Sequence, residues 1–125
     1  MIALDTSVLI DALTGPKRSA AVLRRTIEKG ERIVVPALVI YEWLRGPRLP
    51  QELAAQEALF PHEEAVTFGA QEATLSARLY RTLTRPRGRE IDIAIAACAI
   101  SREAALWTLN TGDFKDIHEL RLFLP

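Results

Sequence analysis

The sequence predicts an α/β protein, in which helices cover both faces of a central parallel sheet of four to five strands in a three-layer α/β/α sandwich. Three observations predict this fold class. Short apolar runs alternate along the chain with longer segments of helical periodicity. The short runs are apolar almost without interruption, as strands buried on both faces are. The length of 125 residues suits one domain covering residues 1–125.

Four short apolar runs are expected to form strands, with an optional fifth near the end of the chain. The first run stops at Asp5, and the second, rich in β-branched residues, stops at Pro36. Turn-forming or charged residues bound the remaining runs. The expected strands cover residues 2–4, 32–35, 65–68, 105–109 and, as the optional fifth, 122–124.

Six helices are expected in the intervals, because glycine and proline residues interrupt the chain between them. In the second helix, Ala20, Leu23 and Ile27 share one face, and Gly30 closes the segment. The last helix is apolar almost all round, which indicates a buried helix. The expected helices cover residues 8–13, 17–29, 38–44, 51–59, 71–84 and 91–100.

Composition narrows the class of protein. Sixteen basic residues balance sixteen acidic ones, which argues against binding nucleic acid by bulk charge but permits local contacts. The lone Cys98 cannot form a disulfide within the chain, which favours a reducing, cytoplasmic setting. We expect no signal peptide, and the apolar stretches are too short to span a membrane.

Four acidic residues occupy positions where a solvated charge is not expected. Asp5 and Asp113 follow expected strands, Glu42 lies among apolar residues, and Asp92 is the only charge in the apolar helix. Each residue taken alone has a structural explanation. Asp5 could cap a helix, Glu42 could face solvent between two buried faces, and Asp113 could belong to a turn.

Asp92 gives the sharpest signal of the four. Its structural explanation is a helix cap, or a salt bridge to Arg87 or Arg89. A charge in so apolar a segment is otherwise paired with an opposite charge or bound to a metal ion.

Taken together, the four acids predict a metal site. The carboxyl ends of parallel strands share one edge of a sheet, so Asp5 and Asp113 can meet there. Glu42 and Asp92 lie early in helices that follow turns. Converging carboxylates repel one another, and a divalent cation removes that conflict. Oxygen ligands without histidine or cysteine select Mg²⁺ or Mn²⁺.

Four segments in order resemble the motifs of PIN-domain ribonucleases: Leu-Asp-Thr-Ser-Val-Leu-Ile-Asp, Val-Ile-Tyr-Glu, Asp-Ile-Ala-Ile-Ala-Ala and Thr-Leu-Asn-Thr-Gly-Asp-Phe. The short chain is similar to a VapC-type toxin of a type II toxin–antitoxin system. The resemblance implies one or two Mg²⁺ or Mn²⁺ ions held by a catalytic quartet: Asp5, Glu42, Asp92 and Asp113. It also implies supporting roles for Thr6, Ser7, Thr108 and Asn110.

The resemblance further implies cleavage of RNA, homodimers, and inhibition by a small VapB-like antitoxin. One departure is the stretch Ser-Arg-Glu-Ala-Ala before the last motif, where many relatives carry a glycine. Trp43, Leu44 and the helix over residues 53–59 are the expected partner surface.

Arg85, Arg87 and Arg89 precede the Asp92 helix and are the expected RNA-binding residues. A plain solvated surface explains them equally well. Two other functions stay open: a non-catalytic RNA- or protein-binding module, and a phosphatase or phosphotransfer domain with an acidic Mg²⁺ site. The spacing disfavours both phosphotransfer types considered: Ser7 stands where a haloacid-dehalogenase-type enzyme wants a second aspartate, and Lys115 lies after Asp113, whereas a receiver domain wants its lysine near the last strand.

Overall fold

The computed structural model describes all residues from 1 to 125 and contains a parallel sheet of three strands in the order β2-β1-β3. Strand β1 (Ile2–Leu4) lies in the centre, between β2 (Ile33–Val34) and β3 (Ala105–Trp107). Ile2 stands opposite Ile33 on one side and opposite Ala105 on the other. All of β1 is buried, because both its edges are paired and helices cover its faces.

The expectation of four to five strands is wrong, because the two outer segments form single bridges only. Val66 pairs with Pro36, and Leu122 pairs with Leu106, each without a neighbouring pair. Strand β2 gives way to a helix at Ala37, so the residues after Val66 have no strand left to pair with. After Leu122 the chain leaves the sheet, and Leu124 is largely exposed.

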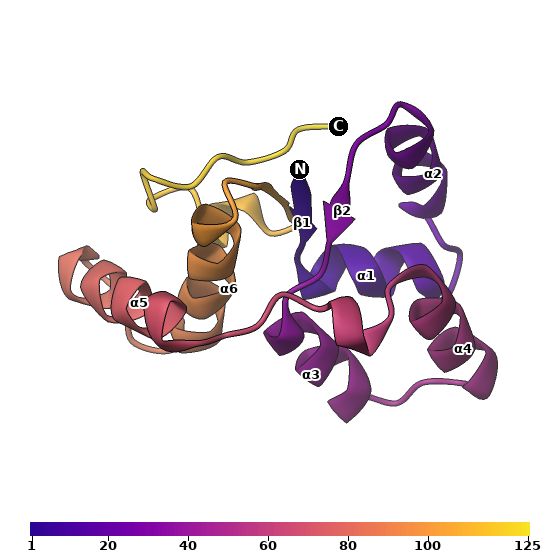
Figure 1. Cartoon of the computed structure of the whole chain (residues 1–125), viewed down its shortest axis with the longest axis horizontal. Helices are drawn as coiled ribbons and strands as arrows, with labels where there is room; N and C mark the ends of the chain where they lie inside the picture. The colour runs from indigo at the N-terminus through magenta and orange to yellow at the C-terminus, as the bar shows by residue number, and fades with distance from the viewer.

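All six expected helices are present, with boundaries that differ by a few residues. In Figure 1, α5 and α6 lie together on one side of the strands and α2 and α4 lie on the other. Two short 3-10 turns were not expected: η1 (His62–Glu64) and η2 (Thr111–Asp113). The helices are α1 (Thr6–Leu13), α2 (Ala20–Glu28), α3 (Ala37–Arg45), α4 (Pro50–Leu59), α5 (Ala70–Thr82) and α6 (Glu90–Ser101).

The core contains much of the sheet and of α6, with residues of α1 and α3, and it confirms the expectation that α6 is buried. Seven consecutive residues of α6, from position 93 to 99, are buried. Leu4 of β1 and Leu106 of β3 are fully buried beside them in the same apolar cluster. None of the helices combines the length and apolar character that crossing a membrane requires.

The topology brings the starts of several helices to one edge of the sheet. Helix α1 begins two residues after β1 ends, and α3 begins three residues after β2 ends. The strands are parallel, so both helices start from the same end, as Figure 1 shows. Parallel α/β sheets usually bind ligands at this edge.

Candidate active site

Asp5 lies at the carboxyl end of β1, where its side chain is almost fully buried. The residue occupies the N-cap position of α1, yet its side chain makes no capping hydrogen bond. Instead, Asp5 Oδ2 accepts hydrogen bonds from Ser7 Oγ at 2.9 Å and from Thr108 Oγ1 at 2.7 Å. Only 4% of Asp5 is exposed. Capping does not explain this carboxylate, which two hydroxyl groups hold in one orientation.

Ser7 and Thr108 also connect the ends of β1 and β3. Ser7 Oγ accepts a hydrogen bond from the backbone N–H of Leu109 at 3.0 Å. Thr108 Oγ1 accepts one from the backbone N–H of Asn110 at 3.0 Å. The carbonyl of Asn110 in turn accepts from the N–H of Asp113. Residues about a hundred positions apart in the sequence are therefore fixed beside the Asp5 carboxylate.

Glu42 lies in α3 and is partly buried, with 19% of its side chain exposed. Thr6 Oγ1 donates a hydrogen bond to Glu42 Oε1 at 2.5 Å, which ties α3 to the first residue of α1. Arg45 makes a longer contact of 3.4 Å to Glu42 Oε2. Of the four expected acids, Glu42 alone has an ion pair in this structure.

Asp92 lies in the first turn of α6, and its pKa is raised from 3.8 to about 6. Burial is the largest cause, followed by the negative charges of Asp5, Asp113 and Glu42. The N-cap of α6 is Arg89, and Asp92 has no ion pair with Arg87 or Arg89. Neither structural explanation of Asp92 therefore holds.

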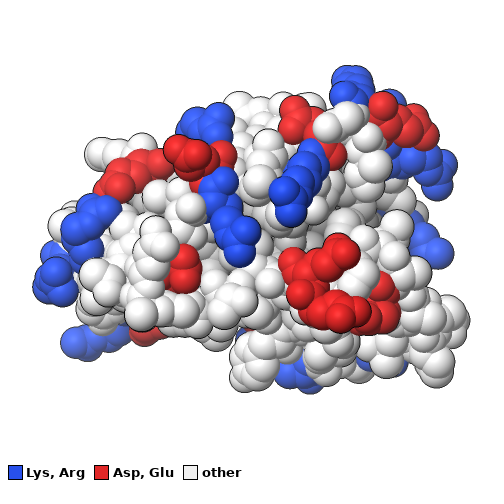
Figure 2. All heavy atoms as spheres, viewed as in Figure 1, with Lys and Arg blue, Asp and Glu red and all other residues white.

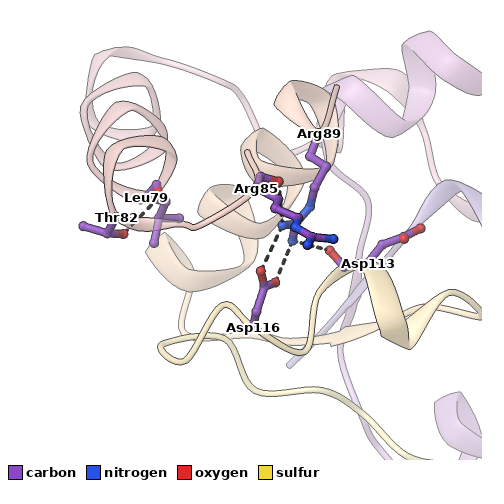
Figure 3. Close-up of polar contacts among 6 residues, drawn as sticks. All are labelled: Leu79, Thr82, Arg85, Arg89, Asp113 and Asp116. Carbon is purple, nitrogen blue, oxygen red and sulfur yellow. Dashed lines mark hydrogen bonds and ion pairs between the residues drawn. The ribbon is translucent and has the colours of Figure 1, made fainter. Parts of the chain in front are cut away.

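Asp113 is the last residue of η2 and is exposed to solvent. Its backbone is held by Arg89, whose Nη2 donates to the Asp113 carbonyl at 2.8 Å. The same guanidinium pairs with both oxygens of Asp116, at 2.6 and 2.9 Å. In Figure 3 the carboxylate of Asp113 points away from Arg89, so this clamp leaves the carboxylate free.

The four acids lie near one another, but no three of the chain's acidic, histidine and cysteine side chains converge tightly enough to enclose a metal ion. Their chemistry nevertheless fits a hard divalent cation. All four offer oxygen atoms as ligands. The negative charges of the other three acids repel the Asp92 carboxylate, and Asp92 forms no ion pair that would offset this repulsion. The residues that could hold such an ion are Asp5, Glu42, Asp92 and Asp113. Hydroxyl groups of neighbouring residues orient two of these carboxylates, those of Asp5 and Glu42.

The three arginines expected to bind RNA differ in their surroundings. Arg85 and Arg87 are exposed on the segment between α5 and α6. The Arg89 side chain is only 20% exposed and is engaged by Asp116 and Asp113. No local sequence pattern predicts that Arg89 bonds to Asp116, because the two residues are 27 positions apart.

Of the residues expected to form a partner surface, Trp43 is completely buried. That part of the expectation is wrong, because the Trp43 ring packs inside the core. The guanidinium of Arg48 lies over this ring, 4.4 Å from its centre. Leu44, Leu53 and Leu59 are exposed, as the expectation requires.

Comparison with known proteins gives consistent matches over nearly the whole chain. The family model described as PIN domain matches residues 2–120. The chain is 35% identical over 120 residues to Ribonuclease VapC19 of Mycobacterium tuberculosis, covering 94% of this chain and 95% of that protein.

Solved structures with the same fold include chains from VapBC and toxin–antitoxin structures. One is DNA-bound VapBC from Salmonella typhimurium, with a TM-score of 0.81, 22% identity and coverage of 98% of this chain and 96% of that one. Another is VapBC-1 from nontypeable Haemophilus influenzae, with a TM-score of 0.76, 24% identity and coverage of 98% and 97%. At these identities, the likeness concerns the fold.

Proposed function

The chain belongs to the PIN-domain family and resembles its VapC ribonucleases over nearly its full length, and from this premise we propose that it is a metal-dependent endoribonuclease and the toxin of a toxin–antitoxin pair. In this proposal Asp5, Glu42, Asp92 and Asp113 hold one or two Mg²⁺ or Mn²⁺ ions. The observation that carries the assignment is the nearness of three carboxylates from separate elements to Asp92, whose pKa is raised by burial first and then by the charges of Asp5, Asp113 and Glu42.

The chain's own residues prepare this site for an anionic substrate. When bound, a divalent ion supplies the positive charge and Lewis acidity that phosphodiester cleavage requires. Ser7 and Thr108 fix the Asp5 carboxylate, and Thr6 orients Glu42. The clamp from Arg89 holds the Asp113 backbone while its carboxylate stays free. Such fixed orientation lets ligands act without reorganisation during the reaction.

An antitoxin partner forms part of the proposal, because similar folds occur in VapBC complexes. A hollow of about 570 Å³ lies between α1, α2 and α4, and its apolar lining includes Leu13, Leu23, Ile27 and Leu59. We assign this hollow to apolar side chains of a VapB-like antitoxin. Homodimer formation and a cytoplasmic setting remain parts of the same proposal.

The test is RNA cleavage by Asp5→Asn and Asp92→Asn variants with Mg²⁺ or Mn²⁺. Both variants should lose cleavage by a factor of about a hundred or more, because each removes a charged oxygen ligand. Glu63→Gln is the matched control, since Glu63 is exposed on η1 and makes no hydrogen bond or ion pair. Wild-type activity in either aspartate variant, or no RNA cleavage by the wild-type chain with either metal, contradicts the proposal.

The same preparations separate the two other functions considered from the sequence. A binding module would retain RNA or protein binding but would show no cleavage and no thermal stabilisation by Mn²⁺. A phosphatase would hydrolyse phosphomonoesters and leave internal RNA linkages intact. Cleavage within an RNA whose ends are blocked supports the endonuclease and excludes both.

A further inference from the structure

A recess beside the acidic residues offers more than a place for a metal ion. Its volume is about 470 Å³, within the roughly 300–1,000 Å³ range of small-ligand sites. Glu42 and Asp92 line it, so the recess opens directly from the candidate active site. The other residues that line it are Arg45, Gly88, Glu90 and Ile91.

Arg45 is the only basic residue that lines this recess. Its single contact with Glu42 is 3.4 Å long, and 53% of its side chain is exposed. Arg89, in contrast, makes two shorter bonds to Asp116 and is only 20% exposed. An exposed ion pair such as that of Arg45 contributes little to stability. Its guanidinium is therefore free to take a second anionic partner, and its fork matches a phosphate.

Tyr41 lies one helical turn before Arg45 on α3, and the Arg45 guanidinium stands 5.2 Å from the centre of its ring. Tyr41 is 53% exposed, which leaves part of the ring accessible. Apart from covering Arg45, this ring has no role in the core. Exposed aromatic rings beside arginine are the usual means by which proteins bind the bases and phosphates of single strands.

The surface around the candidate site that Figure 2 shows carries no large basic patch. On the face shown in Figure 2, basic and acidic side chains are interspersed, and no continuous basic surface forms. The net charge of the chain is zero. A polyanion that reaches the acidic residues must then be held by local contacts near them.

We propose that Arg45 and Tyr41 form an RNA subsite at the rim of this recess. In this subsite Arg45 binds a backbone phosphate adjacent to the scissile phosphate, and Tyr41 stacks on the base of the nucleotide that carries the bound phosphate. The subsite rests on the proposed ribonuclease function. It adds a substrate-binding role on α3 that does not depend on Arg85, Arg87 or Arg89.

The test measures binding of a fluorescent single-stranded RNA in EDTA, where the oligonucleotide stays intact, across a series of KCl concentrations. Arg45→Gln should weaken binding and reduce the slope of log affinity against log salt by about 0.7, the value for one phosphate contact on a single strand. Tyr41→Ala should weaken binding about five-fold or more, with an unchanged slope. Arg45→Lys should keep the slope.

Arg25→Gln is the matched control, because Arg25 also lies in the last turn of a nine-residue helix and is exposed. It should bind RNA like the wild-type chain. A second readout uses RNAs that each carry one neutral methylphosphonate. When the methylphosphonate replaces the phosphate that Arg45 binds, the wild-type chain should bind this RNA more weakly than the unmodified RNA. Arg45→Gln should bind the two RNAs equally well.

The outcomes separate the subsite from the ribonuclease function. If the wild-type chain binds and cleaves RNA while Arg45→Gln and Tyr41→Ala match the control in affinity and slope, the subsite is wrong and the ribonuclease stands. If the wild-type chain neither binds nor cleaves RNA, both are wrong. With cleavage intact, Arg45→Gln should raise KM more than it lowers kcat.

Discussion

Two carboxyl groups near Arg89 have opposite pKa shifts, and the direction in which the guanidinium points explains the difference. Arg89 makes two hydrogen bonds to Asp116, which lower the pKa of that carboxyl. Asp92 lies three residues from Arg89 but receives no hydrogen bond from it, and burial and neighbouring acids raise its pKa to about 6. The positive charge of Arg89 thus stabilises a surface carboxylate and leaves the candidate active site short of cations.

The raised pKa of Asp92 predicts how the stability of the metal-free chain depends on pH. Between about pH 4 and 6 the folded chain binds a proton more tightly than the unfolded chain, so the free energy of unfolding falls as pH rises through this range. Asp92→Asn removes this loss. In EDTA the variant should be more stable than the wild-type chain by about 1–3 kcal/mol at pH 7.5 and equal to it below pH 4. Urea unfolding at several pH values measures the difference.

Asp116→Asn provides a control of opposite sign. The pKa of Asp116 is lowered, so its contribution to stability is present at neutral pH and is lost as pH falls. This variant should be less stable than the wild-type chain at pH 7.5 and should approach it in acid. If Asp92→Asn also destabilises the chain at pH 7.5, the repulsion among the acids is not what the structure implies.

At this scale the sequence marks the candidate acids more clearly than the cations. Asp92 could be selected because it is the only charge in an apolar helix, and Asp5 because it ends a buried strand. Nothing local marks Arg45 or Arg89, whose roles follow from contacts made on folding. Arginines are common on surfaces, so their spacing alone does not distinguish a clamp from a solvated side chain.

The helices and turns determine which of these side chains can move. Turn η2 carries Asp113 on three residues, and its connection to α6 is the hydrogen bond from Arg89 to the Asp113 carbonyl, drawn in Figure 3. The turn's own backbone bonds, such as Phe114 N–H to the Thr111 carbonyl, are local. A short 3-10 turn of this kind is weak on its own, so we expect the arginine to contribute to its order beside the buried Phe114 that follows the turn.

Arg89→Gln should therefore loosen η2. Amide hydrogen exchange at Asp113, Phe114 and Lys115 should accelerate about ten-fold, which corresponds to losing about 1.4 kcal/mol of local stability. Arg78→Gln is the matched control, because Arg78 makes a similar two-pronged bond to Glu119 away from the acids. Equal exchange at these three amides in both variants would show that Arg89 does not hold the turn.

The helices were easier to predict than the strands, for a physical reason. A helix satisfies its hydrogen bonds within its own segment, so periodicity and flanking glycine or proline residues locate it. A strand requires a partner that the local sequence does not reveal. Residues 65–68 have the composition of a strand, yet only Val66 pairs, because β2 has already turned into α3.

The whole molecule assembles the candidate site from elements that are distant in the sequence. Asp5 follows β1, Glu42 lies on α3, Asp92 starts α6 and Asp113 ends η2. The parallel topology brings these elements to one edge, as the position of the acids after expected parallel strands and turns predicted. How closely the four carboxylates approach one another depends on side-chain packing, which the motifs do not predict. Only the folded chain gathers the four acids, so an ion that binds them should stabilise folding.

The central claim is that these acids share a divalent ion, and anomalous diffraction from crystals grown with Mn²⁺ tests it most directly. We predict an anomalous peak within bonding distance of carboxylate oxygens from both Asp5 and Asp92, with Asp113 or Glu42 beside it. The Asp92→Asn variant should lose this peak under the same conditions. A Mn²⁺ peak bound elsewhere, in a protein that still cleaves RNA with Mn²⁺, would contradict the account.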